Sequence, residues 1–226
     1  MRISLDSVSV EWSGNAALNR VSLDLEQKHI AVIGANGSGK STFARLLNGL
    51  VKPTSGKVFV GGTDVQVDPK TAQRQAGFIF SNPDLQIIMP TVIEDVEFSL
   101  KPLKLAAAET RTRALAALDQ FGISSLVERR AHELSSGQKQ LLALAAVSVT
   151  NPKLIIADEP TALLDLRNTQ QVAAALFGLA DQQVVLVTHD LSLAERCDVA
   201  VRFESGRLLE VGEPTDVIAR YRRGYL

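Results

Sequence analysis

Cysteine is nearly absent from this sequence, and so is any excess of charge. The 226 residues include one cysteine, Cys197, so an internal disulfide is impossible and a reducing, cytoplasmic setting is expected. We expect Cys197 to be a small buried hydrophobic residue. The 24 basic and 25 acidic residues give a net charge of −1, which argues against a partner held by charge, such as nucleic acid.

Long apolar runs are also missing. The longest one, Leu141 to Val147, is far shorter than the ~20 residues that a membrane-spanning helix needs. Residues 1–12 lack the charged and apolar regions of a secretion signal. We therefore expect no membrane-spanning segment, so that any role at a membrane must come through a partner.

What the sequence does contain is an alternation of apolar strands with helical segments, which predicts an α/β fold with a parallel, helix-covered sheet. The helical segment at 106–121 is closed by Gly122 as a C-cap, and residues 206–223 are predicted to be a short tail. The chain is predicted to be one domain with a core of about 1–82 and 151–226 and a helical subdomain of about 83–150. Strands are expected at 3–12, 21–25, 29–33, 57–60, 77–80, 154–157, 184–187 and 199–203, with further helices at 42–50, 135–149 and 167–180.

A glycine-rich loop follows the predicted strand 29–33 and precedes the helix 42–50. Its sequence, GANGSGKS at 34–41, has the spacing G-x-x-x-x-G-K-[ST] of a phosphate-binding loop. Lys40 is expected to bind the β- and γ-phosphates of ATP, and Ser41 to bind Mg²⁺. The alternative, a glycine turn with an exposed lysine, does not explain the strand–loop–helix context. The other residues expected to bind the nucleotide here are Gly34, Asn36, Gly37, Ser38, Gly39 and Thr42.

A second pattern is an apolar strand that ends in two acids, Asp158 and Glu159. Unpaired buried carboxylates are costly, so packing gives no reason for them. With a phosphate loop elsewhere, Asp158 is expected to hold Mg²⁺ and Glu159 to act as the base that polarises the attacking water. The alternative is a strand end that is simply solvated.

The pentapeptide Leu134-Ser135-Ser136-Gly137-Gln138 opens the helix 135–149, and Ser135 with Gln138 also fits a capping box. It lies between the phosphate loop and the Asp-Glu strand, and there it resembles the Leu-Ser-Gly-Gly-Gln signature of the ATP-binding cassette (ABC) ATPases. The resemblance implies that Ser135, Gly137 and Gln138 bind the γ-phosphate held by the opposite subunit of a dimer. Ser136 departs from the usual glycine.

Further positions match the same family. The resemblance implies that Trp12 stacks on adenine, although a core tryptophan is the alternative. It places Asp165 on the loop that crosses the dimer interface and makes His189 the switch histidine that orients the water. His29 and His132 match no catalytic position. The implied fold is a P-loop NTPase core with an antiparallel β edge and a helical signature subdomain.

Three less specific segments resemble the ATPases of energy-coupling factor (ECF) uptake transporters: LNGLVKPTSG at 47–56, NPDLQ at 82–86 and PTVIEDV at 90–96. The family's glutamine after the strand 77–80 is replaced by Ser81, and Gln86 is a candidate substitute. The resemblance implies a homodimer or a heterodimer with a similar ATPase, at the cytoplasmic face of the membrane. Integral membrane subunits would dock near Ser81–Asp95.

The expected function is therefore ATP hydrolysis that powers a membrane importer, with biotin as the solute. A cobalt or nickel ECF-type ATPase and a soluble, non-transport ABC ATPase are the alternatives. A P-loop kinase is a further rival class, but the signature at 134–138 would have no role in it.

Overall fold

The computed structural model describes residues 1–12 and 14–224. They divide into two units, which are described separately. The core unit comprises Met1–Gly77, Lys153–Glu159 and Asp181–Leu226, and the helical unit comprises Phe78–Pro152 and Pro160–Ala180.

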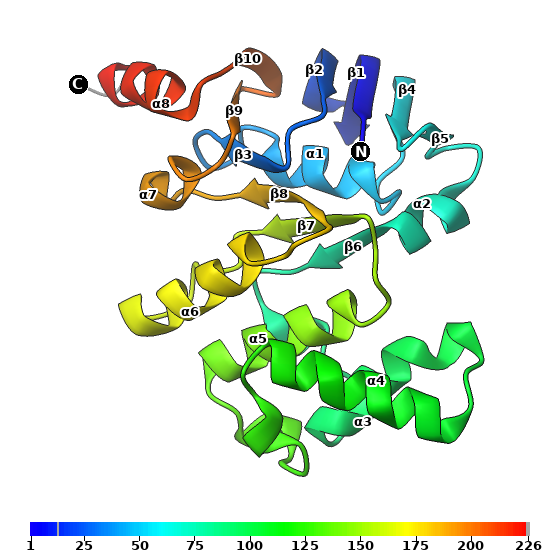
Figure 1. The fold of residues 1–226 in the computed structure, drawn as a ribbon. Helices are drawn as coiled ribbons and strands as arrows, with labels where there is room; N and C mark the ends of the chain where they lie inside the picture. Colours follow the sequence, from blue (N-terminus) through cyan, green and yellow to red (C-terminus); the bar gives the residue numbers. More distant parts are fainter. Residues whose placement is uncertain (13, 225–226) are drawn as a thin grey trace. The chain divides into compact units, whose positions relative to one another are not determined.

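Figure 1 labels the helices and strands along the chain. The strands are β1 (Ile3–Trp12), β2 (Asn15–Leu25), β3 (His29–Ile33), β4 (Ser55–Val60), β5 (Thr63–Asp64), β6 (Ala76–Ile79), β7 (Leu154–Asp158), β8 (Gln183–Val187), β9 (Val199–Glu204) and β10 (Arg207–Gly212). The helices are α1 (Lys40–Leu47), α2 (Pro69–Gln75), α3 (Val92–Leu100), α4 (Ala107–Gln120), α5 (Ser136–Ser148), α6 (Leu166–Phe177), α7 (Leu191–Ala194) and α8 (Pro214–Arg223).

The strands form two sheets. One has the order β2-β1-β4-β5 with antiparallel pairs, and the other has the order β10-β9-β3-β8-β7-β6. In the second sheet β9, β3, β8 and β7 pair in parallel, and β10 is antiparallel to β9. The predicted α/β fold with a parallel core is confirmed, and the implied antiparallel part forms the separate β2-β1-β4-β5 sheet.

Strand composition explains which strands are central. All five residues of β7 and of β8 are buried, as expected for parallel strands with both faces covered. By contrast, buried and more exposed residues alternate along β1. This alternation is interrupted at Ser7, which has a left-handed φ of 50°. The register with β2 shifts between Leu5 and Val8 at this point, so the irregularity in the sequence pattern is a β-bulge.

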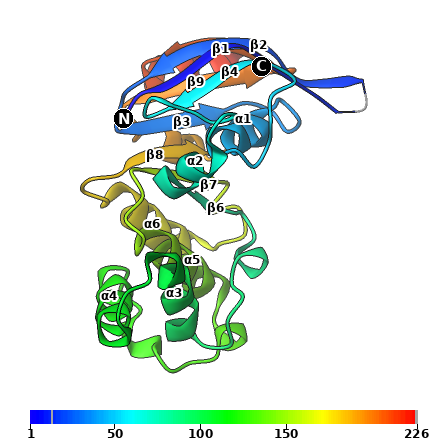
Figure 2. The ribbon, with the colours of Figure 1, turned by 90° about the vertical axis from the view of Figure 1, so that its right-hand side faces the viewer.

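Helix α1 lies between the two sheets of the core unit. It contacts β2 and β4 of the antiparallel sheet and β7 and β8 of the parallel sheet (Figure 2). Phe43, Ala44, Leu46 and Leu47 are fully buried there. At ~25 cal/mol per Å² of buried apolar area, two leucines and a phenylalanine contribute several kcal/mol, which anchors the loop that precedes the helix.

The helical unit packs α3 against α4 and α5, and α5 also contacts α6. Thr91 and Glu94 form a capping box that starts α3. Ser135 is the N-cap of α5, as the sequence predicted. Gly122 follows α4 with a left-handed φ of 68°, in keeping with its predicted role in ending that helix.

Several expected element bounds were wrong; β2, for example, begins at Asn15 rather than at residue 21. The helix after the phosphate loop runs over Lys40–Leu47 rather than 42–50, because Asn48 caps it and Gly49 has a left-handed φ of 72°. The tail 206–223 contains β10, which pairs antiparallel with β9 after a turn with left-handed φ at Ser205 and Gly206, and α8, whose Arg220 pairs with Glu210 on β10. Cys197 is buried as predicted, and burial raises the pKa of its thiol to about 12. Among the described residues, no helix is both long and apolar enough to cross a membrane.

Candidate nucleotide-binding site

The loop between β3 and α1 has glycines for two different physical reasons. A Cβ on Gly39, where φ is 102°, would lie 2.6 Å from the carbonyl oxygen of Ala17 and 2.7 Å from Leu18 Cδ2. A Cβ on Gly37, where φ is 77°, would meet nothing within 4 Å. Gly39 is therefore required by packing against β2, whereas the loop at Gly37 is open to a ligand that approaches the backbone.

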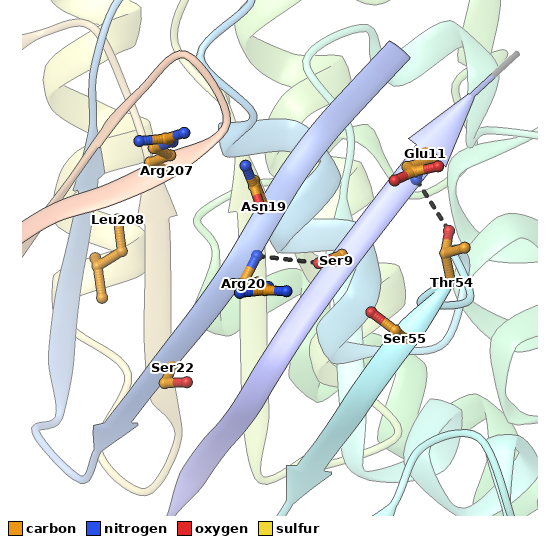
Figure 3. A pocket seen from close by; sticks show the side chains of 9 residues that line it. All are labelled: Ser9, Glu11, Asn19, Arg20, Ser22, Thr54, Ser55, Arg207 and Leu208. Carbon is orange, nitrogen blue, oxygen red and sulfur yellow. Dashed lines mark hydrogen bonds between the residues drawn. The ribbon is translucent and has the colours of Figure 1, made fainter. Parts of the chain in front are cut away.

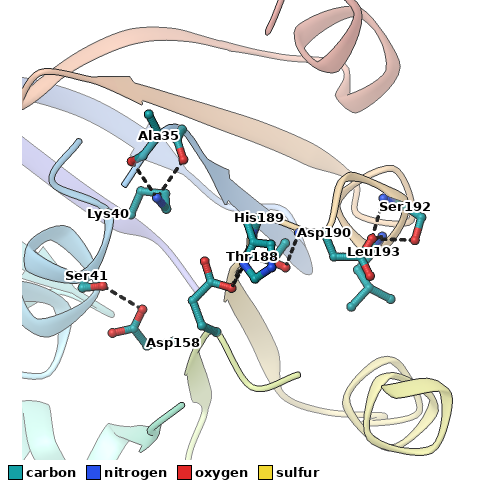
Figure 4. A network of polar contacts seen from close by, with 11 residues as sticks. Ala35, Lys40, Ser41, Asp158, Thr188, His189, Asp190, Ser192 and Leu193 are labelled. Carbon is teal, nitrogen blue, oxygen red and sulfur yellow. Dashed lines mark hydrogen bonds and ion pairs between the residues drawn. The ribbon is translucent and has the colours of Figure 1, made fainter. Parts of the chain in front are cut away.

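Lys40 places a positive charge inside this loop. Its Nζ donates to the carbonyl oxygens of Gly34 at 2.7 Å and Ala35 at 2.9 Å (Figure 4). The residue is 6% exposed, and burial lowers the pKa of its ammonium group, while the charges of Glu159 and Asp158 oppose that shift. An anion that contacts Nζ would therefore stabilise the charged form.

A cavity of 230 Å³ opens beside this charge and beside the N-terminus of α1. Ser38 contributes a buried Oγ that has no hydrogen-bond partner among the described residues. Inward-facing backbone N–H groups, a helix N-terminus and a lysine are the donor set that binds phosphate. The residues that line the cavity are Ala17, Asn36, Gly37, Ser38, Gly39, Lys40, Ser41, Thr42 and Glu159.

Ser41 and Asp158 contact each other beside the phosphate-binding loop. Ser41 Oγ donates to Asp158 Oδ1 at 3.0 Å, although the residues lie 117 positions apart (Figure 4). Burial raises the pKa of the Asp158 carboxyl, while the Ser41 hydroxyl and the charge of Arg45 partly offset that shift. Hydroxyl and carboxylate oxygens are donors that Mg²⁺ accepts, and it needs only one or two protein ligands beside a phosphate. The described residues hold no cluster of three or more His, Cys, Asp or Glu that could bind a metal by itself.

Arg45 was not predicted from the sequence. Its Nη2 lies 3.9 Å from Asp158 Oδ2. The spacing gave a usable signal, because residues four apart share one face of a helix and Ser41 already faces Asp158. The side chain of Arg45 is 46% exposed, so this contact adds little stability and mainly biases the carboxylate's position.

Glu159 directly follows Asp158 and has a left-handed backbone, with φ of 53°. This is an uncommon and strained conformation for a residue other than glycine. The N–H of Glu159 donates to the carbonyl oxygen of Val187, and its Oε2 lies 2.7 Å from His189 Nδ1. Because a carboxylate accepts hydrogen bonds, this contact favours the tautomer that has its proton on Nδ1.

The loop that carries His189 is fixed on both sides. The N–H of Asp190 donates to Thr188 Oγ1 at 3.0 Å, and Asp190 Oδ1 accepts from the N–H of Ser192 at 2.9 Å (Figure 4). Thr188 is completely buried. The ring is therefore presented from a rigid strand end rather than from a free loop.

Trp12 does not line the cavity. It lies at the end of β1, opposite Asn15 on β2, and it is 54% exposed. The core alternative for this tryptophan is therefore wrong. Its predicted stacking on adenine stays a prediction.

The remaining predicted residues belong to the helical unit. Ser135 and Gln138 make both bonds of a capping box, at 3.0 and 3.3 Å, and Asp165 Oδ1 caps α6 by accepting from the N–H of Asn168. A Cβ on Gly137 would lie 2.3 Å from Asn168 Oδ1. Glycine at 137 is therefore required by α6 of the same chain, and no sequence spacing pointed to Asn168.

A larger hollow, of 810 Å³, contains none of the predicted site residues. It lies on the outer face of the antiparallel sheet and beside β10, where Arg20, Arg207 and several hydroxyl groups line it (Figure 3). Its lining lacks both a phosphate loop and a carboxylate pair, so the smaller cavity is the candidate site.

Comparison with known proteins identifies the type of site. Residues 18–162 match the ABC transporter family. This chain belongs to the ABC transporter family. It is 45% identical to the biotin transport ATP-binding protein BioM of Rhizobium etli, over 98% of each chain. It is 37% identical to the energy-coupling factor transporter ATP-binding protein EcfA1 of Levilactobacillus brevis, over 96% of this chain and 81% of the relative.

A solved structure agrees with this ABC assignment. The chain resembles cbiO1 from Clostridium perfringens, part of the ABC transporter complex cbiONQ, with a TM-score of 0.87 and 30% identity over 97% of this chain and 91% of that one. The resemblance to ECF-type ABC ATPases is therefore confirmed, and with it the ATP-binding, ATP-hydrolysing nature of the chain.

One departure from the ABC pattern is clarified by the geometry. Gln86, the candidate substitute for the glutamine missing at Ser81, is occupied within its own loop. Its Nε2 donates to the carbonyl oxygen of Phe78 at 3.0 Å, and its Oε1 accepts from the N–H of Phe80 at 3.3 Å. These bonds oppose the idea that Gln86 swings into the catalytic site.

Proposed function

We propose that this ABC ATPase powers an ECF-type importer in the membrane and that biotin is the transported solute. The observation that carries the ATPase part is the cavity at Lys40, with the Ser41–Asp158 and Glu159–His189 pairs beside it. The name of one relative with 45% identity, BioM of Rhizobium etli, supports biotin. The part of the proposal that concerns the membrane rests on the ECF-type resemblance.

In this proposal the chain's own residues have separate tasks. Lys40 and the backbone of residues 36–42 bind the phosphates, and Ser41 with Asp158 would hold Mg²⁺, which screens phosphate charge when bound. Glu159 accepts a proton from the attacking water. The oxygen of that water bonds to the γ-phosphorus while the bond between the γ-phosphorus and the bridging oxygen breaks. His189 keeps that carboxylate in place, and the products are ADP and phosphate.

The signature residues would act across a dimer, either a homodimer or a heterodimer with a similar ATPase. Ser135, Gly137 and Gln138 would contact the γ-phosphate bound by the other subunit, and Asp165 would lie on the loop that crosses the interface. ATP would then stabilise the closed dimer because it binds that state better. Trp12 would stack on adenine, for which its exposure leaves an aromatic face accessible.

Membrane subunits would dock on the helical unit near Ser81–Asp95, at the cytoplasmic face. Within this segment Leu85 is 74% exposed and Ile88 is 63% exposed. Exposed apolar side chains so close together are typical of a surface that binds a partner.

The test is uptake in cells that lack their own biotin transporter. We would express the chain with its membrane subunits and measure accumulation of labelled biotin, nickel and cobalt, with Lys40→Ala as the inactive control. Biotin uptake that depends on Lys40 is expected. Uptake of the metals alone would favour the cobalt or nickel alternative, and failure to co-purify with any membrane protein would favour a non-transport ABC ATPase.

A further inference from the structure

The segment 80–89 of the helical unit is held in one shape by buried polar side chains. Gln86 bridges the backbone of Phe78 and Phe80. Asp95, which is 4% exposed, accepts the N–H groups of residues 88–89 at 2.9 and 3.0 Å. The exposed apolar side chains of this segment therefore stand on a fixed backbone.

Two consecutive residues of α5 also hold this segment. Lys139 Nζ donates to Asp84 Oδ1 at 2.7 Å, and Gln140 Nε2 donates to the carbonyl oxygen of Phe80 at 3.1 Å. Gln140 is 1% exposed. Both residues directly follow Gln138, the last residue of the signature. A displacement of the segment would therefore pull on α5 within one turn of its start.

The position of Lys139 is unfavourable for the helix itself. A cation near a helix N-terminus opposes the helix dipole. The N–H of Lys139 donates to the carbonyl oxygen of Ser135 at 2.9 Å, in the first turn of α5, yet its side chain is only 18% exposed. The carboxylate of Asp84 offsets this charge. The ion pair therefore connects α5 to the segment 80–89 and does not stabilise the helix itself.

We propose that the Lys139–Asp84 ion pair, together with the Gln140–Phe80 hydrogen bond, transmits the docking of the membrane subunits to the signature serine Ser135. This inference rests on the proposed function. It makes Lys139 a positioning residue, whose side chain is not a ligand of ATP. Because serine at 81 is short, the response to the partner then depends on α5 rather than on residue 81.

The test is a charge-reversal cycle in the complex of this chain with its membrane subunits, reconstituted in phospholipid vesicles. The readout is the ratio of ATP turnover with the membrane subunits to turnover without them. Lys139→Glu and Asp84→Lys should each lower this ratio at least about fivefold, and the double reversal should restore most of it. Lys139→Met, which keeps the apolar part of the side chain, should lower the ratio even if Lys139→Glu folds poorly.

The control is Arg113→Glu, which breaks an ion pair of 2.6 Å with Glu109 on α4, away from the segment. It should leave the ratio unchanged. If wild-type turnover does not respond to the membrane subunits, the proposed function fails and this inference with it. If the wild type responds and Lys139→Met responds equally, or if the double reversal fails to restore the ratio, this inference alone is overturned.

Discussion

Lys40 is the residue on which we expect nucleotide binding to depend most directly. Its ammonium group is buried and is held by two carbonyl oxygens of its own loop. Lys40→Ala removes the only full positive charge among the residues that line the cavity, so ATP should bind at least about tenfold more weakly. Titration calorimetry with ATP measures this, with exposed Lys28→Ala as the control. Equal affinity in the Lys40 variant and the wild type would contradict the assigned phosphate site.

Asp95 gives a prediction about pH. Burial raises the pKa of its carboxyl, and the bonds from residues 88–89 only partly offset that. Because the folded pKa is the higher one, the favourable contribution of this group is present at low pH and is lost as pH rises through the folded pKa. An asparagine keeps a carbonyl oxygen for both N–H groups but never ionises.

Asp95→Asn should therefore gain stability relative to the wild type as pH rises from about 3 through the raised pKa of Asp95. Urea unfolding at a series of pH values measures the difference in free energy of unfolding between the two proteins. A difference that stays constant over that range would show that the buried carboxyl does not titrate as described.

At the scale of elements, apolar strands were predictable and amphipathic edges were not. The segments of β3, β7 and β8 are short, nearly continuous apolar runs, which are typical of buried parallel strands. In contrast β10 alternates between exposed and half-buried residues, and α8 is mostly polar. The position of β10 follows from the turn at Ser205 and Gly206 and from its backbone pairing with β9, and α8 contacts it through the Arg220–Glu210 ion pair, which leaves no periodic signal in the sequence.

The candidate site also contains one contact that the sequence predicted and one that it did not. The meeting of Ser41 with Asp158 was expected, because a phosphate loop and an acidic strand end gather at the carboxyl edge of a parallel sheet. The approach of Asn168 to Gly137 was not, because it depends on how α6 packs against α5. Sequence patterns predict contacts that follow from strand order. They do not predict contacts that depend on side-chain packing between helices.

Ser81 follows β6 and gives a prediction about that connection. Serine is shorter than glutamine by two heavy-atom links, so its hydroxyl should not reach a bound metal directly, and a bridging water costs up to ~2 kcal/mol in immobilisation. We expect slow basal turnover in the wild type. Ser81→Gln should hold or raise it, and Ser81→Ala should change it less than about twofold.

Steady-state phosphate release by both Ser81 variants, with and without the membrane subunits, is the measurement. Loss of hydrolysis in Ser81→Ala, while ATP still binds, would mean that the serine takes part directly. That result would also mean that the membrane subunits act on turnover through residue 81.

At the scale of the whole molecule, the proposed function predicts that the Glu159–His189 pair sets the lifetime of a closed ATP-bound dimer. Each chain carries both a base and a signature, so two identical chains have everything that two sites require. Glu159→Gln keeps the size and one oxygen acceptor of the side chain but cannot accept a proton. Turnover should fall at least about a hundredfold, the lower end of what a general base contributes, while ATP binding remains.

The amide should also lengthen the life of the dimer, because it removes a negative charge beside the γ-phosphate and blocks the reaction that opens the closed state. Size-exclusion chromatography of Glu159→Gln should therefore show a dimer with Mg-ATP and a monomer with Mg-ADP. Exposed Glu26→Gln is the matched control, and it should elute and hydrolyse ATP like the wild type. Hydrolysis at the wild-type rate in Glu159→Gln would mean that another group is the base. A variant that binds ATP, lacks turnover and stays monomeric would point to a heterodimer, in which the missing surface belongs to a second ATPase.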